Sequence, residues 1–178
     1  MLWGNCGLKP NFLTIIISDK VMTPEPNSFL GEYRYTIDEK GRVNVPAPFR
    51  KVLHPANNRT FVLSKSIAKD KCLVAMPFED WSIFEDNLTK KLLRMNPIDQ
   101  KWLRDLTRYA TICRYDSQGR ITIPKSLLEV AGLSNEAVII GMLKQIEIWD
   151  PGELDKKSSD DEQLTEEQLA ALAEKIVL

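Results

Sequence analysis

The chain has 178 residues, of which 43% are hydrophobic and 28% charged, the composition of an ordinary soluble globular protein with room for one domain or two small ones. Its net charge of −1 conceals an uneven distribution: residues 29–150 hold 19 basic and 15 acidic residues, whereas residues 151–178 hold eight acidic residues and three lysines. Three cysteines without a CxxC spacing and a single histidine, His54, give no pattern for a disulfide framework, a zinc site or a histidine-based catalytic centre, and they favour a reducing, cytosolic compartment.

The first 28 residues differ from the rest of the chain. They contain an apolar run from Phe12 to Ile17, followed by a segment rich in turn-forming residues. The run is much shorter than the roughly 20 apolar residues that a membrane span needs. It also lacks the basic start and the small-residue cleavage site of a signal peptide. We therefore expect residues 1–28 to be a flexible extension or the product of an upstream start site, and we expect no membrane association.

A regular β pattern begins at Phe29. Apolar and polar residues alternate from 33 to 37, which predicts a half-buried strand. Glu39-Lys40-Gly41 then predicts a turn in which Gly41 supplies a positive φ, and residues 42–45 form the returning strand. The following elements are expected to be a short helix from Pro46 to Leu53 and strands over 60–64 and 71–76.

Residues 77–110 predict a helical connector. Trp81, Phe84, Leu88 and Leu92 recur at spacings of three and four and line one helix face, and Asn96-Pro97 is typical of the start of a second helix. The aromatic pair Trp81 and Trp102 could form a groove for a partner or a cofactor. The interpretation that we favour is that these side chains pack the helix pair onto the sheet.

The second half of the chain repeats the first at a constant offset of 78 residues. Residues 111–115, 120–123, 124–132, 137–141 and 145–149 predict strand, strand, helix, strand and strand, so each half reads β-turn-β-α-β-β. The residues that recur identically are Asp38, Gly41, Arg42, Pro46 and Val52, as Asp116, Gly119, Arg120, Pro124 and Val130. Only the acidic segment 151–178 then remains, with a weakly amphipathic stretch from 164 to 178 that is either mobile or a surface helix.

The repeated turn has the form Asp-x-x-Gly-Arg. A tight turn requires the glycine, but turn geometry does not require an arginine directly after it. The aspartate four positions earlier could hold that arginine by a charge-assisted hydrogen bond and fix its direction. A guanidinium oriented in this way suits the O6/N7 edge of guanine or a backbone phosphate. A solvent-exposed hairpin with ordinary turn residues remains the simpler interpretation of one copy; duplication favours a functional role.

These motifs closely resemble those of MraZ proteins. The residues that carry the resemblance are Phe29-Leu30-Gly31-x-Tyr33, the turn Asp38 to Arg42 with Pro46, Ala110-Thr111, and the turn Asp116 to Arg120 with Ile121-x-Ile123-Pro124. MraZ belongs to the SpoVT-AbrB, or swapped-hairpin, group of bacterial transcription factors. The resemblance covers about residues 29–150. Family members usually begin with methionine just before the equivalent of Phe29, where this chain has Ser28 after 27 further residues.

The resemblance implies an α+β fold of a particular kind. We expect a tandem swapped-hairpin AbrB-like β-barrel, in which two β-β-α-β-β repeats form an intrachain pseudo-dimer, with packed helices between and after the repeats. The expected divisions are 1–28, an N-terminal extension; 29–76, the first SpoVT-AbrB repeat; 77–110, the helical connector; 111–150, the second repeat; and 151–178, the acidic tail.

The resemblance also implies a function. MraZ proteins form homo-oligomeric rings and bind repeated double-stranded DNA boxes upstream of the operon for cell division and cell-wall synthesis. We therefore expect a cytoplasmic, nucleoid-associated transcriptional regulator, most simply a repressor, with Arg42 and Arg120 as the main readers of DNA. The DNA-binding residues carried over are Asp38, Lys40, Gly41, Arg42, Asp116, Gln118, Gly119 and Arg120; nearby basic residues that could contact phosphate are Arg34, Arg50, Lys51 and Arg114.

The sequence leaves two other classes of protein open. An AbrB-like antitoxin or protein-interaction scaffold would use the acidic segment 151–178 to hold a partner. An enzyme has the least support, because the sequence shows no nucleophile with a base, no phosphate-binding glycine loop and no metal cluster. We expect no cofactor, no metal and no small-molecule substrate.

Overall fold

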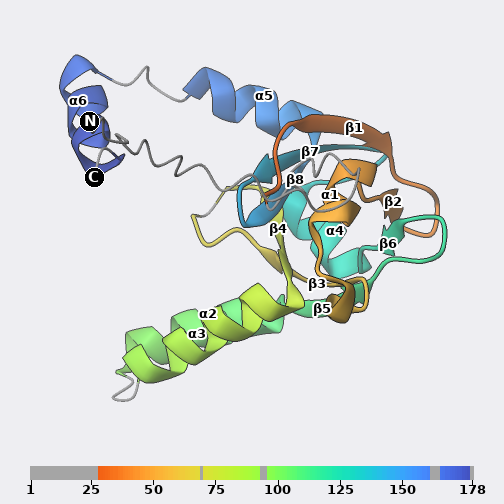
Figure 1. Ribbon diagram of the computed structural model, residues 1–178, viewed down its shortest axis with the longest axis horizontal. Coiled ribbons are helices and arrows are strands. Elements are labelled where there is room, and N and C mark those ends of the chain that lie inside the picture. The colour runs from red at the N-terminus through yellow and green to blue at the C-terminus, as the bar shows by residue number, and fades with distance from the viewer. Residues whose placement is uncertain (1–27, 69, 93–95, 161–164, 177–178) are drawn as a thin grey trace, which may run out of the picture.

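The computed structural model describes residues 28–68, 70–92, 96–160 and 165–176 (Figure 1). The predicted extension over residues 1–28 lies outside this part of the chain, apart from Ser28. The fold is α+β. The strands are β1 Glu32–Thr36, β2 Arg42–Asn44, β3 Thr60–Lys65, β4 Cys72–Pro77, β5 Thr111–Arg114, β6 Arg120–Thr122, β7 Glu136–Met142 and β8 Gln145–Trp149. The helices are α1 Ala47–Val52, the 3-10 helix η1 Pro55–Asn57, α2 Phe78–Lys91, α3 Pro97–Arg108, α4 Lys125–Ala131, α5 Pro151–Asp160 and α6 Glu166–Ile176.

Local sequence signals account for the ends of several helices. The side chain of Asn96 accepts hydrogen bonds from the backbone N–H groups of Ile98 and Asp99, as an N-cap residue should. Helix α4 ends at Gly132, whose φ of 67° lies in the left-handed region that glycine adopts without strain. These boundaries agree closely with the predicted ones.

The strands within the described residues form two antiparallel sheets. The larger one has the order β1-β7-β8-β4-β3-β5, and β2 pairs with β6 in the smaller one. In the larger sheet Tyr33 lies opposite Ile139, and Phe61 lies opposite Cys113. In the smaller sheet Val43 lies opposite Ile121, its own counterpart at the 78-residue offset.

Strands are exchanged between the two halves of the chain. Strand β1 of the first half pairs with β7 of the second, β5 of the second half pairs with β3 of the first, and β2 pairs with β6. The central pair β4–β8 also joins the halves. Each half therefore depends on the other for many of its backbone hydrogen bonds, and the two halves form a single folding unit.

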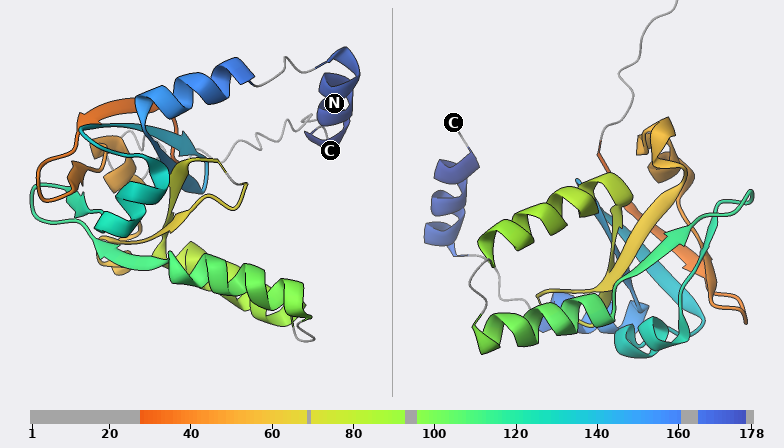
Figure 2. Two further views of the ribbon diagram at one scale, coloured as in Figure 1. Left: turned by 180° about the vertical axis from the view of Figure 1, so that it is seen from behind. Right: turned by 90° about the horizontal axis from the view of Figure 1, so that it is seen from below.

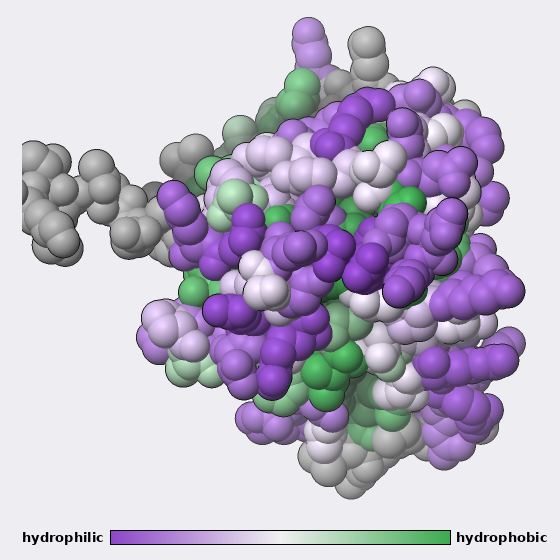
Figure 3. Space-filling model, turned by 90° about the vertical axis from the view of Figure 1, so that its right-hand side faces the viewer, coloured by the Kyte–Doolittle hydropathy of each residue, from purple (hydrophilic) through white to green (hydrophobic). Residues whose placement is uncertain are grey.

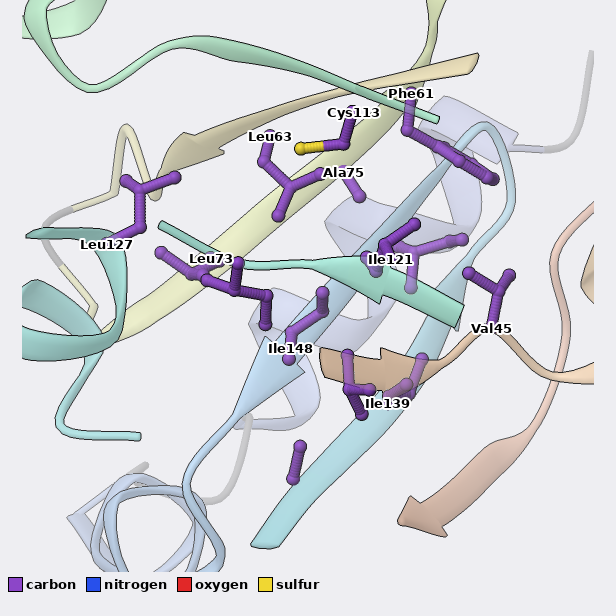
Figure 4. Packing of buried hydrophobic residues seen from close by; sticks show 14 of the residues in the cluster. Val45, Phe61, Leu63, Leu73, Ala75, Cys113, Ile121, Leu127, Ile139 and Ile148 are labelled. Atoms are coloured by element: carbon purple, nitrogen blue, oxygen red, sulfur yellow. The ribbon is translucent and has the colours of Figure 1, made fainter. Parts of the chain in front are cut away.

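One hydrophobic core lies between the sheets and the short helices. Its side chains come from both halves and point into one interior, as Figure 4 shows for Val45, Phe61, Ile121 and Ile139. Phe49 of α1 packs edge-on against Phe29, with ring centroids 5.4 Å apart. The core is thus a second reason why neither half could fold alone, since each would expose the apolar face that the other covers.

Helices α2 and α3 form a pair that projects from the edge of the sheet instead of lying over it (Figures 1 and 2). Leu106 of α3 is buried where the pair meets the sheet, and Lys65 of β3 forms an ion pair with Asp105 of α3. Trp81 and Trp102 remain partly exposed, and neither belongs to the core. The helices meet the sheet through contacts of α2 with β3 and β4 and of α3 with β3. That Trp81 and Trp102 contribute to these contacts stays a prediction.

Helix α5, the first part of the acidic segment, packs against the outside of β7. Leu154 contacts a small cluster of Cys72, Val138 and Trp149. Lys71 forms an ion pair with Glu153 at 3.4 Å on the same side. Helix α6 is exposed along its whole described length. None of the helices in the described ranges is long and apolar enough to span a bilayer.

Candidate nucleic-acid interface

The first repeated turn is closed by hydrogen bonds from one aspartate. Asp38 Oδ1 accepts from the backbone N–H of Lys40 at 3.0 Å and of Arg42 at 2.9 Å. Asp38 Oδ2 accepts from Arg42 Nε at 2.7 Å and lies 2.6 Å from Arg42 Nη2. Gly41 has a φ of 72°, as predicted. The carboxylate therefore holds both the backbone of the turn and the direction of the arginine.

The second turn reproduces this arrangement. Asp116 Oδ1 accepts from the N–H of Gln118 at 2.9 Å and of Arg120 at 3.0 Å. Asp116 Oδ2 accepts from Arg120 Nε at 3.0 Å and from Nη2 at 2.8 Å. Gly119 has a φ of 81°. Two independent sequences, Glu39-Lys40 and Ser117-Gln118, thus give the same geometry, because the aspartate, glycine and arginine are shared.

The Asp–Arg pairs are charged at neutral pH. The side-chain hydrogen bond from Arg42, followed by that from its backbone N–H, lowers the pKa of Asp38 to about 2. The backbone N–H of Arg120, followed by its side chain, lowers the pKa of Asp116. Each guanidinium uses Nε and Nη2 for the aspartate, so its other N–H groups can donate to a second acceptor. The arginine side chains are 30% and 26% exposed, which leaves them accessible.

The two turns lie next to each other and are joined by backbone hydrogen bonds. The N–H of Val45 donates to Gly119 O at 2.8 Å, and the N–H of Ile123 donates to Gly41 O at 2.9 Å. Asp116 contributes to a raised pKa of Arg42, after the larger effect of Asp38. Both turns project from the same end of the molecule, and the face on that side is mostly hydrophilic (Figures 1 and 3). One ligand could therefore contact both turns.

The other predicted basic residues lie on elements that adjoin the turn strands along the chain. Arg34 of β1 is exposed and pairs with Glu32 at 3.4 Å. Lys51 of α1 and Arg114 of β5 are exposed as well. Arg50 is half-buried, and its guanidinium lies against Gly119 of the second turn. Arg50, one of the four candidates for phosphate contact, thus lies in direct contact with a repeated turn.

Sequence reasoning missed Arg59. Its guanidinium lies 5.8 Å from the centre of the ring of Tyr115, the residue that precedes Asp116 in the sequence. The backbone O of Arg59 accepts a hydrogen bond from the N–H of Tyr115 at 3.1 Å. Arg59 and Asn58 both have a positive φ, 62° and 55°. An Asn-Asn-Arg sequence signals a turn but does not reveal which strand the arginine will approach.

The helix pair does not form the groove that Trp81 and Trp102 suggested. Trp81 lines a groove of about 360 Å³ between α2 and α3, together with Leu88 and Leu103, and Trp102 lines different hollows on the other side of α3. The two tryptophans therefore cannot enclose one ligand.

Comparison with known proteins agrees with this geometry. The family model described as "MraZ protein, putative antitoxin-like" matches residues 28–104 and 106–175. The two matched stretches begin 78 residues apart, the same offset as the repeated turns. The "Transcriptional regulator MraZ" of Alkaliphilus oremlandii (strain OhILAs) is 41% identical over 133 residues, which are 75% of this chain and 88% of that protein. The protein of the same name from Alkaliphilus metalliredigens (strain QYMF) is 36% identical over 148 residues, 83% of this chain and 98% of that protein. That from Caldicellulosiruptor saccharolyticus is 36% identical over 147 residues, 83% of this chain and 97% of that protein.

The fold and the paired turns define an internally duplicated α+β protein with two arginine-presenting hairpins. Given the match of the family model and of these relatives over most of its length, the chain belongs to the MraZ family.

Proposed function

We propose that this protein is a sequence-specific DNA-binding transcriptional regulator, acting as a repressor, whose two Asp-x-x-x-Arg turns contact repeated promoter boxes of the cell-division and cell-wall operon. The observation that carries the proposal is the identical fixation of Arg42 and Arg120, each held by Nε and Nη2 on an aspartate. An arginine with a fixed direction loses little entropy when it binds, and its free N–H groups match guanine or phosphate acceptors. The relatives named as transcriptional regulators support the regulatory part of this proposal.

The two arginines would read base edges, while surrounding cations position the protein on the phosphate backbone. Arg34, Lys51 and Arg114 are assigned to phosphate, since they are exposed and lie on the elements next to the turns. Asp38, Gly41, Asp116 and Gly119 shape the turns, and Lys40 and Gln118 flank the arginines.

The exchange of strands between the halves supports the swapped-hairpin, AbrB-like barrel as the architecture of this site. In this arrangement one chain supplies both halves of a pseudo-dimer. The divisions predicted at 29–76, 77–110 and 111–150 then describe two repeats and a connector within one folding unit. A ring of such chains, in the cytoplasm and on the nucleoid, would present the turns at regular intervals, and several weak contacts would combine through effective concentration.

A binding assay with the DNA upstream of the gene for this chain tests the proposal. Arg42→Ala/Arg120→Ala should lower affinity by about 30-fold or more, because two contacts of about 1–3 kcal/mol each are lost. The control is Lys101→Ala/Arg104→Ala on α3, which removes the same charge from exposed positions away from the turns. Equal affinity of the folded turn variant and the control would refute the proposal.

The acidic segment supports a second candidate function, protein interaction. Helix α6 exposes Leu169, Leu172 and Ile176, an apolar set with no cover among the described residues. Removing residues 161–178 should leave DNA binding intact under the leading proposal. A loss of DNA binding on this truncation would instead assign the segment to the DNA interface.

A further inference from the structure

The two short helices contact the repeated turns crosswise. Arg50 of α1 and Leu128 of α4 occupy equivalent positions at the 78-residue offset. A side-chain carbon added to Gly41 would lie 3.2 Å from Leu128 Cδ1, and one added to Gly119 would lie 2.7 Å from Arg50 Cζ and Nη1. The helix of each repeat therefore covers the turn of the other repeat, with a leucine in one case and an arginine in the other.

The same two turns differ in charge at their tips. Lys40 precedes Gly41 in the first turn, whereas the neutral Gln118 precedes Gly119 in the second. The turn without a lysine is the one against which the Arg50 guanidinium lies. The second turn, which has no lysine of its own, thus has a cation beside its glycine, supplied by the other repeat.

Arg50 is also a cation without a counter-ion in the described part of the chain. Its Nε is buried and has no hydrogen-bond partner there, and no carboxylate of the described residues pairs with it. Leaving a partly buried guanidinium unpaired costs free energy, so the fold alone does not explain why an arginine is placed here. The residue remains partly exposed, and a phosphate would supply the acceptor oxygens that the guanidinium lacks.

Gly119 makes this contact possible. Any side chain at position 119 would collide with Cζ, Nη1 and Nε of Arg50, at 2.7 to 2.9 Å from its first carbon. Position 119 therefore requires glycine for two reasons. Its φ of 81° is one that glycine adopts without strain, and the absence of a side chain leaves room for the Arg50 guanidinium.

We propose that Arg50 is the phosphate-binding cation of the second turn, as we assign Lys40 to be in the first. The inference rests on the proposed DNA-binding function and deepens it. The second contact unit is composite: Asp116 and Arg120 come from one repeat and Arg50 from the other. Each turn then presents one additional positive charge to DNA, which Lys40 of the same repeat supplies in the first turn and Arg50 of the other repeat supplies in the second.

Charge relocation tests this inference. Arg50→Leu installs the residue found at position 128, which already packs on the equivalent turn, so the fold should persist. Binding to the upstream DNA should weaken about fivefold to tenfold near 0.1 M salt, and the slope of log K against log salt should fall by about one. Adding Gln118→Lys to Arg50→Leu should restore both the affinity and the slope.

Rescue by Gln118→Lys distinguishes phosphate binding from a purely structural role, because a lysine on the turn cannot repair packing of α1. Lys101→Leu on α3 is the control for loss of one charge, and Arg50→Gln with the same rescue serves if the leucine variant unfolds. An unchanged salt slope in Arg50→Leu, or no rescue by Gln118→Lys, would overturn the inference. If Arg42→Ala/Arg120→Ala abolishes binding while Arg50→Leu leaves it unchanged, the inference fails and the proposed function stands; if neither affects binding, both fail.

Discussion

The two turn glycines should differ in their tolerance of alanine, although both have a positive φ. An L-residue in the left-handed region costs about 1–2 kcal/mol, and this term applies to Gly41→Ala and Gly119→Ala alike. At Gly41 the new methyl group would lie 2.8 Å from the backbone O of Ile123. That backbone also donates the hydrogen bond from Ile123 N–H to Gly41 O at 2.9 Å, so it cannot move without weakening a link between the halves.

The magnitudes follow from these contacts. Steric overlap in a packed region costs about 1–3 kcal/mol, and the weakened hydrogen bond adds about 1 kcal/mol. Gly41→Ala should therefore lower the free energy of unfolding by about 3–6 kcal/mol. At Gly119 the nearest atoms belong to the flexible Arg50 side chain, which can move away, so Gly119→Ala should cost only about 1–2 kcal/mol.

Urea unfolding followed by circular dichroism measures both values. The reasoning also predicts that Gly119→Ala, which displaces Arg50, weakens DNA binding as much as Arg50→Leu and that the two changes together add little more. Equal destabilisation by the two alanine substitutions, or a larger effect at Gly119, would refute it.

Two further predictions follow from the pKa shifts. The hydrogen bonds from Arg42 lower the pKa of Asp38 from 3.8 to about 2. The pair therefore stabilises the fold fully above pH 4, and this contribution is lost as the pH falls through 2. An NMR titration of the Asp38 carboxyl group should give the lowered midpoint, and a midpoint near 3.8 would contradict the pairing with Arg42. Burial raises the pKa of Cys72 to about 12 and that of Cys113 to about 11. In a Cys6→Ser variant, neither thiol should therefore react with an aromatic disulfide at pH 8 until the protein unfolds. Fast reaction of the native protein would show that the core is open at these two cysteines.

The elements of the fold could be predicted from local patterns. Alternation from 33 to 37, the glycines of the turns and the Asn96 cap each depend on a few neighbouring residues, and the structure has strands, turns and a helix start there. The offset of 78 residues also identified the two halves as equivalent. Sequence patterns over a few residues suffice to predict features that depend only on neighbouring residues, such as strand alternation, turns and helix caps.

The pairing of the strands could not be predicted in the same way. Nothing in the sequence of β1 states that its partner is β7 of the other half, because the alternation of Tyr33 and Tyr35 fits any strand with one apolar face. The direction in which the α2–α3 pair projects could not be predicted for a similar reason. An apolar stripe indicates that one helix face packs against other residues, but it does not indicate which residues these are.

In the candidate site, too, contacts between residues close in the sequence could be predicted, whereas the contact between the two repeats could not. Asp38 with Arg42, and Asp116 with Arg120, are contacts between residues four apart, and their hydrogen bonds could be anticipated from spacing. The contact of Arg50 with Gly119 joins residues of different repeats, and it follows only from the exchange of strands. In the sequence Arg50 was one of four equivalent surface cations; in the structure it belongs to the second turn.

Nuclease protection of the DNA upstream of the gene tests the central claim most directly, namely that the two turns read repeated boxes. The native protein should protect a series of short, regularly spaced sites. Arg42→Ala/Arg120→Ala should protect none at a concentration at which Lys101→Ala/Arg104→Ala protects them all. Uniform protection by the native protein, or the same footprint from the folded Arg42→Ala/Arg120→Ala variant, would contradict the account.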